Sequence, residues 1–468
     1  MNNRTRRDLA KPAEADGFRT WVRDGWADPD VRADLVPGAA EAAAAHRDRL
    51  SAAFPGRRLA LAAGRPSVRS HDTFHDFRAD TDFVWLTGFR AEGAVLVMQP
   101  SAAGHDTVLY LPTPADAHEV DFFADADRSP FWVGAVPGPA EWERALGLPC
   151  RPLEELPRGL RGRHPATLSG GRDPLLDALA GGPSADLRRV LAELRRIKDD
   201  WEVGQLRAAV AATVDGFADV ARELGTAVRG GGERWLQGTF DRRARTAGNG
   251  PGYASIVAAG ANSPVLHWTR CDGAVREDDL LLLDAGVEAT TLYTADVTRT
   301  FPVSGEFSEA QRGVYDLVHD AHVAALAQVR PGNDFRAFHD TAMRVLAEGL
   351  HDWGLLPVSV DKALDRDGQH HRRYIVCGTG HFLGLDVHDC ARSRPEAYQE
   401  GVLEQGMALT VEPGLYFHPG DLTLPPELRG IGVRIEDDLV VTATGAEVLS
   451  AGLPTTADGI GAWVSGQG

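Results

Sequence analysis

Four acidic residues in the C-terminal half of the sequence each stand at or near the end of an apolar run, and they constrain the fold more than any other feature. Asp284 closes LLLLDAG, Asp296 lies in YTADVTRTFP, Glu412 ends MALTVE and Glu436 ends IGVRIE. Burying an acid at the end of an apolar strand is costly unless a cation or hydrogen-bond donors meet it. A single such acid is readily explained as a solvated strand end. Four of them together predict a shared site on a sheet.

The alternation of side chains along one of these segments supports this prediction. Asp296 and Thr298 share one face of the predicted strand 292–302, because successive side chains point to opposite faces. A hairpin with the predicted strand 280–285 would bring Asp284 beside Asp296. Two carboxylates that close together repel each other and require a cation.

His381 adds a nitrogen ligand to this set. It lies in CGTGHFLGLDVHD, where the glycines allow the backbone to approach a site closely. Taken alone, it would more often be a structural histidine. With four acids it completes what a pair of divalent ions requires, and such an oxygen-rich set suits Mn²⁺ better than zinc, with iron, cobalt and zinc left open. Two ions so held can carry a hydroxide nucleophile and polarise a scissile carbonyl.

The length of 468 residues predicts two domains. A Gly181-Gly182-Pro183-Ser184 linker divides residues 1–183, an α/β domain with an N-terminal extension, from residues 184–468. The second domain is predicted as α+β, with helices on a curved, largely antiparallel sheet. Its expected helices follow Asp199 and span residues 308–329 and 335–353, and its expected strands span residues 280–285, 292–302, 407–412 and 431–436.

Charge and composition narrow the classes of partner. The formal net charge of −18 disfavours nucleic acid and anionic membrane surfaces. No apolar run reaches the ~18 residues of a membrane span, and no apolar segment follows Arg6-Arg7, so we expect no export signal. The four cysteines form no CxxC pair, which favours a reducing cytoplasm.

Several segments carry a resemblance to a known family. LLLDAG, YTADVTRTFPVSGEFS, GTGHFLGLDVHD, TVEPGLY and RGIGVRIEDDLVVT resemble the pita-bread metallopeptidases, and within them the Xaa-Pro aminopeptidases rather than the methionine aminopeptidases. TDFVWLTGF and RRIKDDWEVGQLR extend the resemblance over nearly the whole chain. It implies a pita-bread catalytic domain behind a smaller creatinase-like domain, and a homo-oligomer (dimer or tetramer) formed through the N-terminal domain.

The resemblance also implies a role for individual residues. The implied metal ligands are Asp284, Asp296, His381, Glu412 and Glu436, with Asp296 and Glu436 bridging two ions. Glu412 would also act as general base. The implied catalytic and substrate-side residues are His267, His388, Arg434 and Tyr253. Among these, His388 would stabilise the tetrahedral intermediate, and Arg434 would orient Glu436. Structural roles remain the alternative for His267, His388 and Tyr253.

Cys377 departs from the family pattern, which usually has histidine at this position. A thiol is a weak hydrogen-bond donor and does not become a cation, whereas imidazole does both. If the family histidine contacts substrate, Cys377 lowers turnover or marks a different substrate. A buried, inert cysteine of similar shape is the alternative.

The leading functional prediction is therefore a metallo-aminopeptidase that releases the residue before proline. The enzyme alternatives are a diverged relative that hydrolyses dipeptides, as a prolidase does, or another small amide. A non-catalytic pita-bread binding module is the third possibility. The complete ligand set argues against it and against the metal-free, creatine-hydrolysing relatives.

Overall fold

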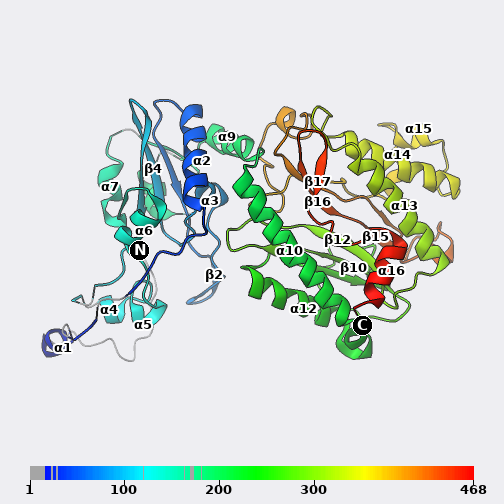
Figure 1. Ribbon diagram of the computed structural model, residues 1–468, viewed down its shortest axis with the longest axis horizontal. Helices are drawn as coiled ribbons and strands as arrows, with labels where there is room; N and C mark the ends of the chain where they lie inside the picture. Colours follow the sequence, from blue (N-terminus) through cyan, green and yellow to red (C-terminus); the bar gives the residue numbers. More distant parts are fainter. Residues whose placement is uncertain are drawn as a thin grey trace. The chain divides into compact units, whose positions relative to one another are not determined.

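The structure is a computed structural model that describes residues 16–22, 25–27, 30–116, 118–119, 121–162, 164–168, 173–180 and 182–467. The chain divides into two compact units, residues 1–191 and 192–468 (Figure 1). Residues 1–15 of the predicted N-terminal extension and Gly181 of the predicted linker lie outside the described residues.

The N-terminal unit is built on a five-stranded mixed sheet in the order β6-β5-β4-β1-β7. Its strands are β1 (Leu59–Ala62), β4 (Val95–Ser101), β5 (Gly104–Leu111), β6 (Cys150–Pro152) and β7 (Ala166–Thr167). The three central strands pair antiparallel, whereas both edge strands pair parallel to their neighbours. A separate short hairpin joins β2 (Val68–Ser70) and β3 (Thr73–Phe74).

Short helices surround this sheet. They are α1 (Asp16–Trp21), α2 (Ala39–Ala53), α3 (Thr81–Thr87), α4 (Asp121–Ala124), α5 (Pro130–Val133), α6 (Pro139–Leu146), α7 (Leu156–Gly159) and α8 (Pro174–Leu179). The alanine-rich run EAAAAHRDRL lies within α2, as expected from the high helix propensity of alanine. The Asp80 side chain caps α3 by accepting from the Phe83 N–H, so the apolar run that begins at Phe83 is helical.

The C-terminal unit contains short antiparallel sheets. One has the order β12-β10-β9, a second has the order β13-β16-β17, and two further pairs are β14-β15 and β11-β8. The strands are β8 (Gly250–Pro251), β9 (Ile256–Ala259), β10 (Leu280–Ala285), β11 (Val287–Glu288), β12 (Val297–Pro302), β13 (Ala408–Val411), β14 (Gly414–Tyr416), β15 (Gly432–Arg434), β16 (Asp437–Val441) and β17 (Ala446–Val448). An isolated bridge between Thr298 and Glu436 connects β12 to the β15–β16 junction.

Two pairs of helices pack with these strands (Figure 1): α10 (Asp200–Arg222) with α12 (Gly232–Ala247), and α13 (Glu309–Leu326) with α14 (Ala337–Asp352). Four further helices are α9 (Ala185–Arg195), α11 (Leu224–Thr226), α15 (Val360–Leu364) and α16 (Ala457–Ser465). Reciprocal capping pairs open two of these helices: Asp199 with Glu202 opens α10, and Ser308 with Gln311 opens α13. Mixed helices and antiparallel strands confirm the predicted α+β class.

Two predicted strands are clearly shorter than expected, and the one predicted over residues 431–436 covers only Gly432–Arg434. The strand predicted over residues 292–302 begins only at Val297. Leu292 has a positive φ of 71° and closes a turn with Ala289, so the chain is not extended there. Asp296 therefore lies directly before β12 rather than inside it.

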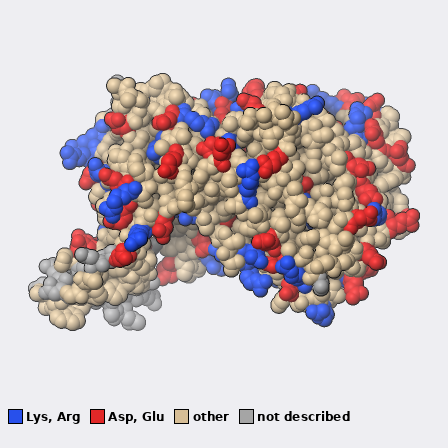
Figure 2. Space-filling model, in the orientation of Figure 1, with Lys and Arg blue, Asp and Glu red and all other residues tan. Residues whose placement is uncertain are grey.

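Charged residues of both signs are interspersed on the face shown in Figure 2. This distribution leaves no broad basic surface on that face for a polyanion to bind. Among the residues that the structure describes, no helix has the length and apolar character needed to cross a bilayer.

Candidate metal centre

One cavity of the C-terminal unit, with a volume of about 650 Å³, gathers every candidate site residue. Its lining includes all five predicted ligands, Asp284, Asp296, His381, Glu412 and Glu436, together with Tyr253, His267, Cys377, His388 and Arg434. In the sequence these side chains are up to 183 positions apart, the distance from Tyr253 to Glu436. The fold therefore brings together what the sequence analysis singled out.

The pairing of β10 with β12 positions the two aspartates. Asp284 lies opposite Thr298 in this antiparallel register, and Asp296 precedes β12 by one residue. Thr298 in turn donates its hydroxyl to Glu436 Oε2 at 2.6 Å. One strand thus links three of the four acids.

His381 and Glu412 are held by a second, irregular pairing of segments. Thr410 N donates to His381 O at 2.9 Å, and Glu412 N donates to Thr379 O at 3.0 Å. Gly380 has a φ of 157°, and a Cβ built there would lie 2.2 Å from Thr410 O. No side chain fits at that distance, which explains the glycine next to the histidine.

Two side chains donate to Asp284. The Tyr253 hydroxyl lies 2.6 Å from both Asp284 Oδ1 and Asp296 Oδ1, and the Arg434 guanidinium contacts Asp284 Oδ2 at 2.5 Å. A hydroxyl carries a single proton, so the two carboxylate oxygens share one donor. Arg434 reaches Glu436 only through Thr298, whose Oγ1 accepts from Arg434 Nε. Its direct contact is with Asp284, whereas the resemblance implied Glu436.

The remaining contacts join His381 to two acids. Its Nε2 lies 3.2 Å from Asp296 Oδ2 and 3.8 Å from Glu412 Oε1, while Nδ1 lies 3.0 Å from the Phe382 carbonyl oxygen. Burial lowers the pKa of His381, but the hydrogen bond and charge of Asp296 outweigh it and raise this pKa to about 9.

Few cationic side chains neutralise the acidic residues of the cavity. Burial raises the pKa of Glu412 to about 7 and holds that of Glu436 well above its usual value, with neighbouring carboxylates adding to the rise at Glu436. The pKa of Asp284 is also raised by burial, although Arg434 opposes the shift. Three buried carboxylates and the half-buried Glu412, with one arginine and one histidine, carry an excess of negative charge, which a bound cation would neutralise.

The ligand atoms fall into overlapping sets, each within 4.8 Å. Asp284, Asp296 and Glu436 form one set, and His381, Glu412 and Glu436 form another. Asp296 also groups with His381 and His388. Glu436 belongs to both of the first two sets and Asp296 connects the first with His381, so the residues present fit a pair of divalent ions whose two shared ligands are carboxylates.

The two candidate substrate histidines are both exposed within the cavity. The His388 ring lies 4.2 Å from the His381 ring, edge to face. Burial and the neighbouring His381 lower the pKa of His388, which leaves a neutral imidazole with one N–H to donate.

Cys377 lines the cavity with a half-buried side chain. Its Sγ lies 4.0 Å from the hydroxyl of Tyr416, which also accepts from Arg434. Burial, with Glu412 nearby, raises the pKa of the thiol. The group is therefore a neutral thiol near pH 7 and not a cation.

Sequence reasoning missed three residues that support the site. Thr298 connects Arg434 to Glu436, Tyr416 contacts Arg434, and Asp438 Oδ2 accepts from the Asp296 N–H at 3.0 Å. Thr298 and Asp438 each stand two positions after a ligand. The period of two that identified the ligands thus provided a signal for them.

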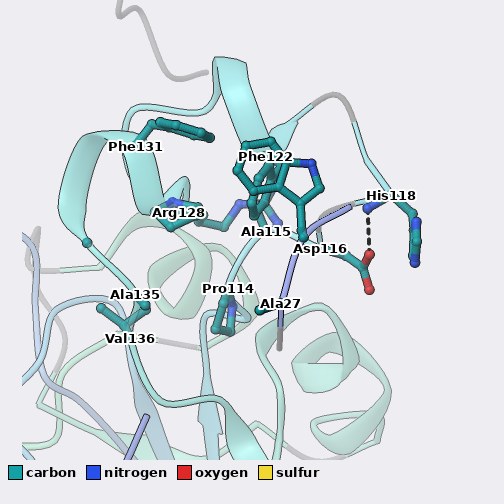
Figure 3. Close-up of a pocket in the computed structure, with 13 residues that line it drawn as sticks. Ala27, Pro114, Ala115, Asp116, His118, Phe122, Arg128, Phe131, Ala135 and Val136 are labelled. Atoms are coloured by element: carbon teal, nitrogen blue, oxygen red, sulfur yellow. Dashed lines mark hydrogen bonds between the residues drawn. The ribbon is translucent and has the colours of Figure 1, made fainter. Parts of the chain in front are cut away.

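A second cavity, of about 520 Å³, lies in the N-terminal unit (Figure 3). Its lining is largely apolar and includes Phe122 and Phe131. Its arginine, Arg128, is paired with Asp121 and Asp125, and its Asp116 accepts from the His118 N–H. Among the described residues, no three metal-ligating side chains converge there, so the C-terminal cavity is the candidate site.

Comparisons with known proteins agree with this site. Residues 204–443 match the family model of metallopeptidase family M24, and residues 43–165 match the aminopeptidase P N-terminal domain. The Xaa-Pro aminopeptidase 2 of Streptomyces coelicolor is 48% identical over 99% of this chain and 99% of that protein. The Xaa-Pro aminopeptidase of Escherichia coli is 33% identical over 85% of this chain and 91% of that protein.

Solved structures give the same result. The Pseudomonas aeruginosa aminopeptidase PepP has a TM-score of 0.81 and 31% identity, covering 92% of this chain and 99% of that one. A variant of E. coli aminopeptidase P in complex with substrate has a TM-score of 0.80 and 30% identity, covering 93% and 99%. The fold and the site define a metallopeptidase. This chain belongs to metallopeptidase family M24, which confirms the predicted family and the predicted enzyme class.

Proposed function

We propose that this chain is a two-metal aminopeptidase that releases the N-terminal residue from peptides with proline in the second position. The observation that carries the proposal is the overlap of ligand sets through Asp296 and Glu436 in one cavity. The full-length similarity to Xaa-Pro aminopeptidases supports the substrate class.

Two divalent ions would be held by Asp284, Asp296, His381, Glu412 and Glu436. When bound, such ions lower the pKa of a water molecule and polarise the scissile carbonyl. The donors are carboxylate oxygens and one imidazole, without a thiolate, and this composition favours Mn²⁺.

Glu412 is the residue that we assign as general base. Its side chain is partly exposed in the cavity, and burial raises its pKa to about 7, close to the value at which a base works well at neutral pH. It accepts the proton of the attacking water and returns it to the leaving amine. His381, 3.8 Å away, limits how far the pKa of Glu412 rises.

The remaining residues bind and orient substrate. His267 and His388 face the cavity from separate loops, and we assign His388 as the donor to the developing oxyanion. Arg434 and Tyr253 fix the carboxylate of Asp284 from two sides. Cys377 lines the same cavity, and we assign it to the part that contacts substrate.

We further propose residues 1–183 as an oligomerisation domain that forms a dimer or tetramer and residues 184–468 as the catalytic domain. The match of residues 43–165 to the aminopeptidase P N-terminal domain supports this division. We propose the cytoplasm as the compartment. All four cysteines are free thiols, which suits a reducing environment.

The test is hydrolysis of Xaa-Pro-Xaa tripeptides by the purified chain with added Mn²⁺, beside Asp296→Asn. Release of the first residue by the wild type alone is the expected result. A wild type that binds the metal and leaves the tripeptides intact would contradict the substrate assignment.

A specific observation favours a second candidate, hydrolysis of dipeptides or another small amide. Cys377 gives the cavity a neutral thiol at a position where the family usually has histidine. Comparing Xaa-Pro with Xaa-Pro-Xaa peptides separates the two functions, because a prolidase acts on the dipeptides alone.

A further inference from the structure

Glu233, in the first turn of α12, has a buried carboxylate that is not part of the cavity lining. Its side chain is 0% exposed, and its two oxygens accept four hydrogen bonds. Oε1 accepts from Ala259 N and Asn262 Nδ2, both at 2.8 Å. Oε2 accepts from Trp268 Nε1 and Gly273 N, both at 2.7 Å.

All four donors belong to one segment, residues 259–273, which we call the His267 loop. Ala259 ends β9 and Gly273 lies at the far end of the loop, so one carboxylate joins both ends. Trp268, the donor in the middle, is the neighbour of His267. Leu266, His267 and Thr269 line the cavity.

Arg234, the residue after Glu233, donates hydrogen bonds to carbonyl groups of the same loop. Arg234 Nε donates to the Cys271 carbonyl oxygen at 3.4 Å, and its Nη2 donates to that of Arg270. A Cβ built on Gly273 would lie 2.8 Å from the Glu233 carboxylate. Gly273 therefore lies close to the Glu233 carboxylate, and a side chain at position 273 would displace that carboxylate.

We infer that Glu233 is a positioning residue, which fixes the His267 loop so that the His267 imidazole meets the substrate. The inference rests on the proposed role of His267 in substrate binding. Glu233 itself faces away from the reaction: its oxygens are used up by four neutral donors, and it touches no residue of the metal centre among its described hydrogen-bond partners.

The test is Glu233→Gln, measured alone and together with His267→Ala. The substitution keeps the shape of the side chain but turns an NH₂ group toward two N–H donors, which releases one end of the loop. We expect kcat/KM to fall by about tenfold or more in the wild-type background, and far less in the His267→Ala background, because residues that act as a unit are not additive.

Thr456→Ala serves as the folding control. Thr456 caps α16 and has no contact with the His267 loop among its described hydrogen bonds. We therefore expect Thr456→Ala to lower the thermal midpoint without lowering kcat/KM. Trp268→Phe provides a second variant if Glu233→Gln does not fold. It removes only the indole donor, and we expect a smaller fall that again depends on His267.

Two results would overturn the inference. One is an equal fold-loss from Glu233→Gln with and without His267, which indicates general destabilisation. The other is an unchanged kcat/KM in a variant that has lost the hydrogen bonds. If His267→Ala has full activity while the wild type hydrolyses Xaa-Pro-Xaa, the inference fails together with the role of His267, and the proposed peptidase function stands.

Discussion

Carboxylates at two places in the C-terminal unit are buried, but they differ in what meets their oxygens. Glu233 accepts four N–H donors. In the cavity, Asp284 and Asp296 share a single tyrosine hydroxyl, and the pKa of Glu436 is held well above its usual value. A carboxylate whose two oxygens accept four donors organises the chain, whereas several carboxylates that share few donors in one cavity indicate a cation that binds there.

Asp389, the neighbour of His388, belongs with Glu233 in this comparison. Its Oδ1 accepts from Arg195 Nη2 and its Oδ2 from Lys198 Nζ, both at 2.9 Å, and all three side chains are buried. The loop of each substrate histidine thus contains or contacts an anchored carboxylate. One carboxylate is held by neutral donors and the other by cations.

The largest expected effect comes from removing a shared ligand. Asp296→Asn should lower kcat/KM by at least about a thousandfold, because loss of an outer partner alone costs 10–100-fold in metal sites. Tripeptide hydrolysis with Mn²⁺ measures it.

Asp173→Asn is the matched control for this substitution. Asp173 is a buried aspartate that caps α8 in the N-terminal unit and accepts from Leu175 and Leu176. Its variant should have full activity. Retention of wild-type activity in Asp296→Asn would break the distinction between the two kinds of carboxylate.

A smaller effect, on stability, should follow Asp389→Asn. Removing one partner of a buried ion pair costs about 3–5 kcal/mol in the free energy of unfolding. Burial raises the pKa of Asp389, but Lys198 and Arg195 outweigh it and hold this pKa well below its usual range.

The pH dependence of this stability follows from the lowered pKa of Asp389 in the folded state. The folded-state pKa lies below the unfolded value of about 3.9, so the stabilisation is complete above this pH and is lost as the pH falls below it. Chemical unfolding should show a constant gap between wild type and Asp389→Asn from pH 8 to 5 and a narrowing gap below about pH 4. A gap that is widest in acid would contradict the ion pair.

Metal removal should destabilise the cavity and leave the anchored carboxylates unaffected. At a free metal concentration of 100 Kd, a bound ion stabilises the folded state by about 2.7 kcal/mol. A chelator should therefore lower the thermal midpoint of the wild type and of Glu233→Gln, and lower that of Asp296→Asn by less. Equal shifts in all three proteins would show that the chelator acts elsewhere.

The smallest effect is expected from Cys377→His, which restores the residue usual in the family. An imidazole is a better donor than a thiol, and an added substrate hydrogen bond is worth about tenfold or less in kcat/KM. Kinetics on Xaa-Pro and Xaa-Pro-Xaa peptides measure both rate and selectivity. If neither changes, Cys377 is an inert space-filling residue.

The sequence predicted the cavity well because its signals are local. Each acidic ligand stands at or beside a strand end, and the register that places Asp284 opposite Thr298 follows from two apolar strands. The turn at Leu292 was missed because a positive φ in a leucine has no signal in the pattern. The roles of Glu233 and Tyr416 were missed as well, since their partners are distant in sequence and no period connects them.

The central claim is that the cavity carboxylates have fewer donors than Glu233 because they bind two divalent ions. The most direct measurement is the metal content of the purified chain after equilibration with Mn²⁺, by mass spectrometry, beside Asp296→Asn and Glu233→Gln. The account predicts two ions per chain in the wild type and in Glu233→Gln, and fewer in Asp296→Asn. Equal metal content in wild type and Asp296→Asn would contradict it.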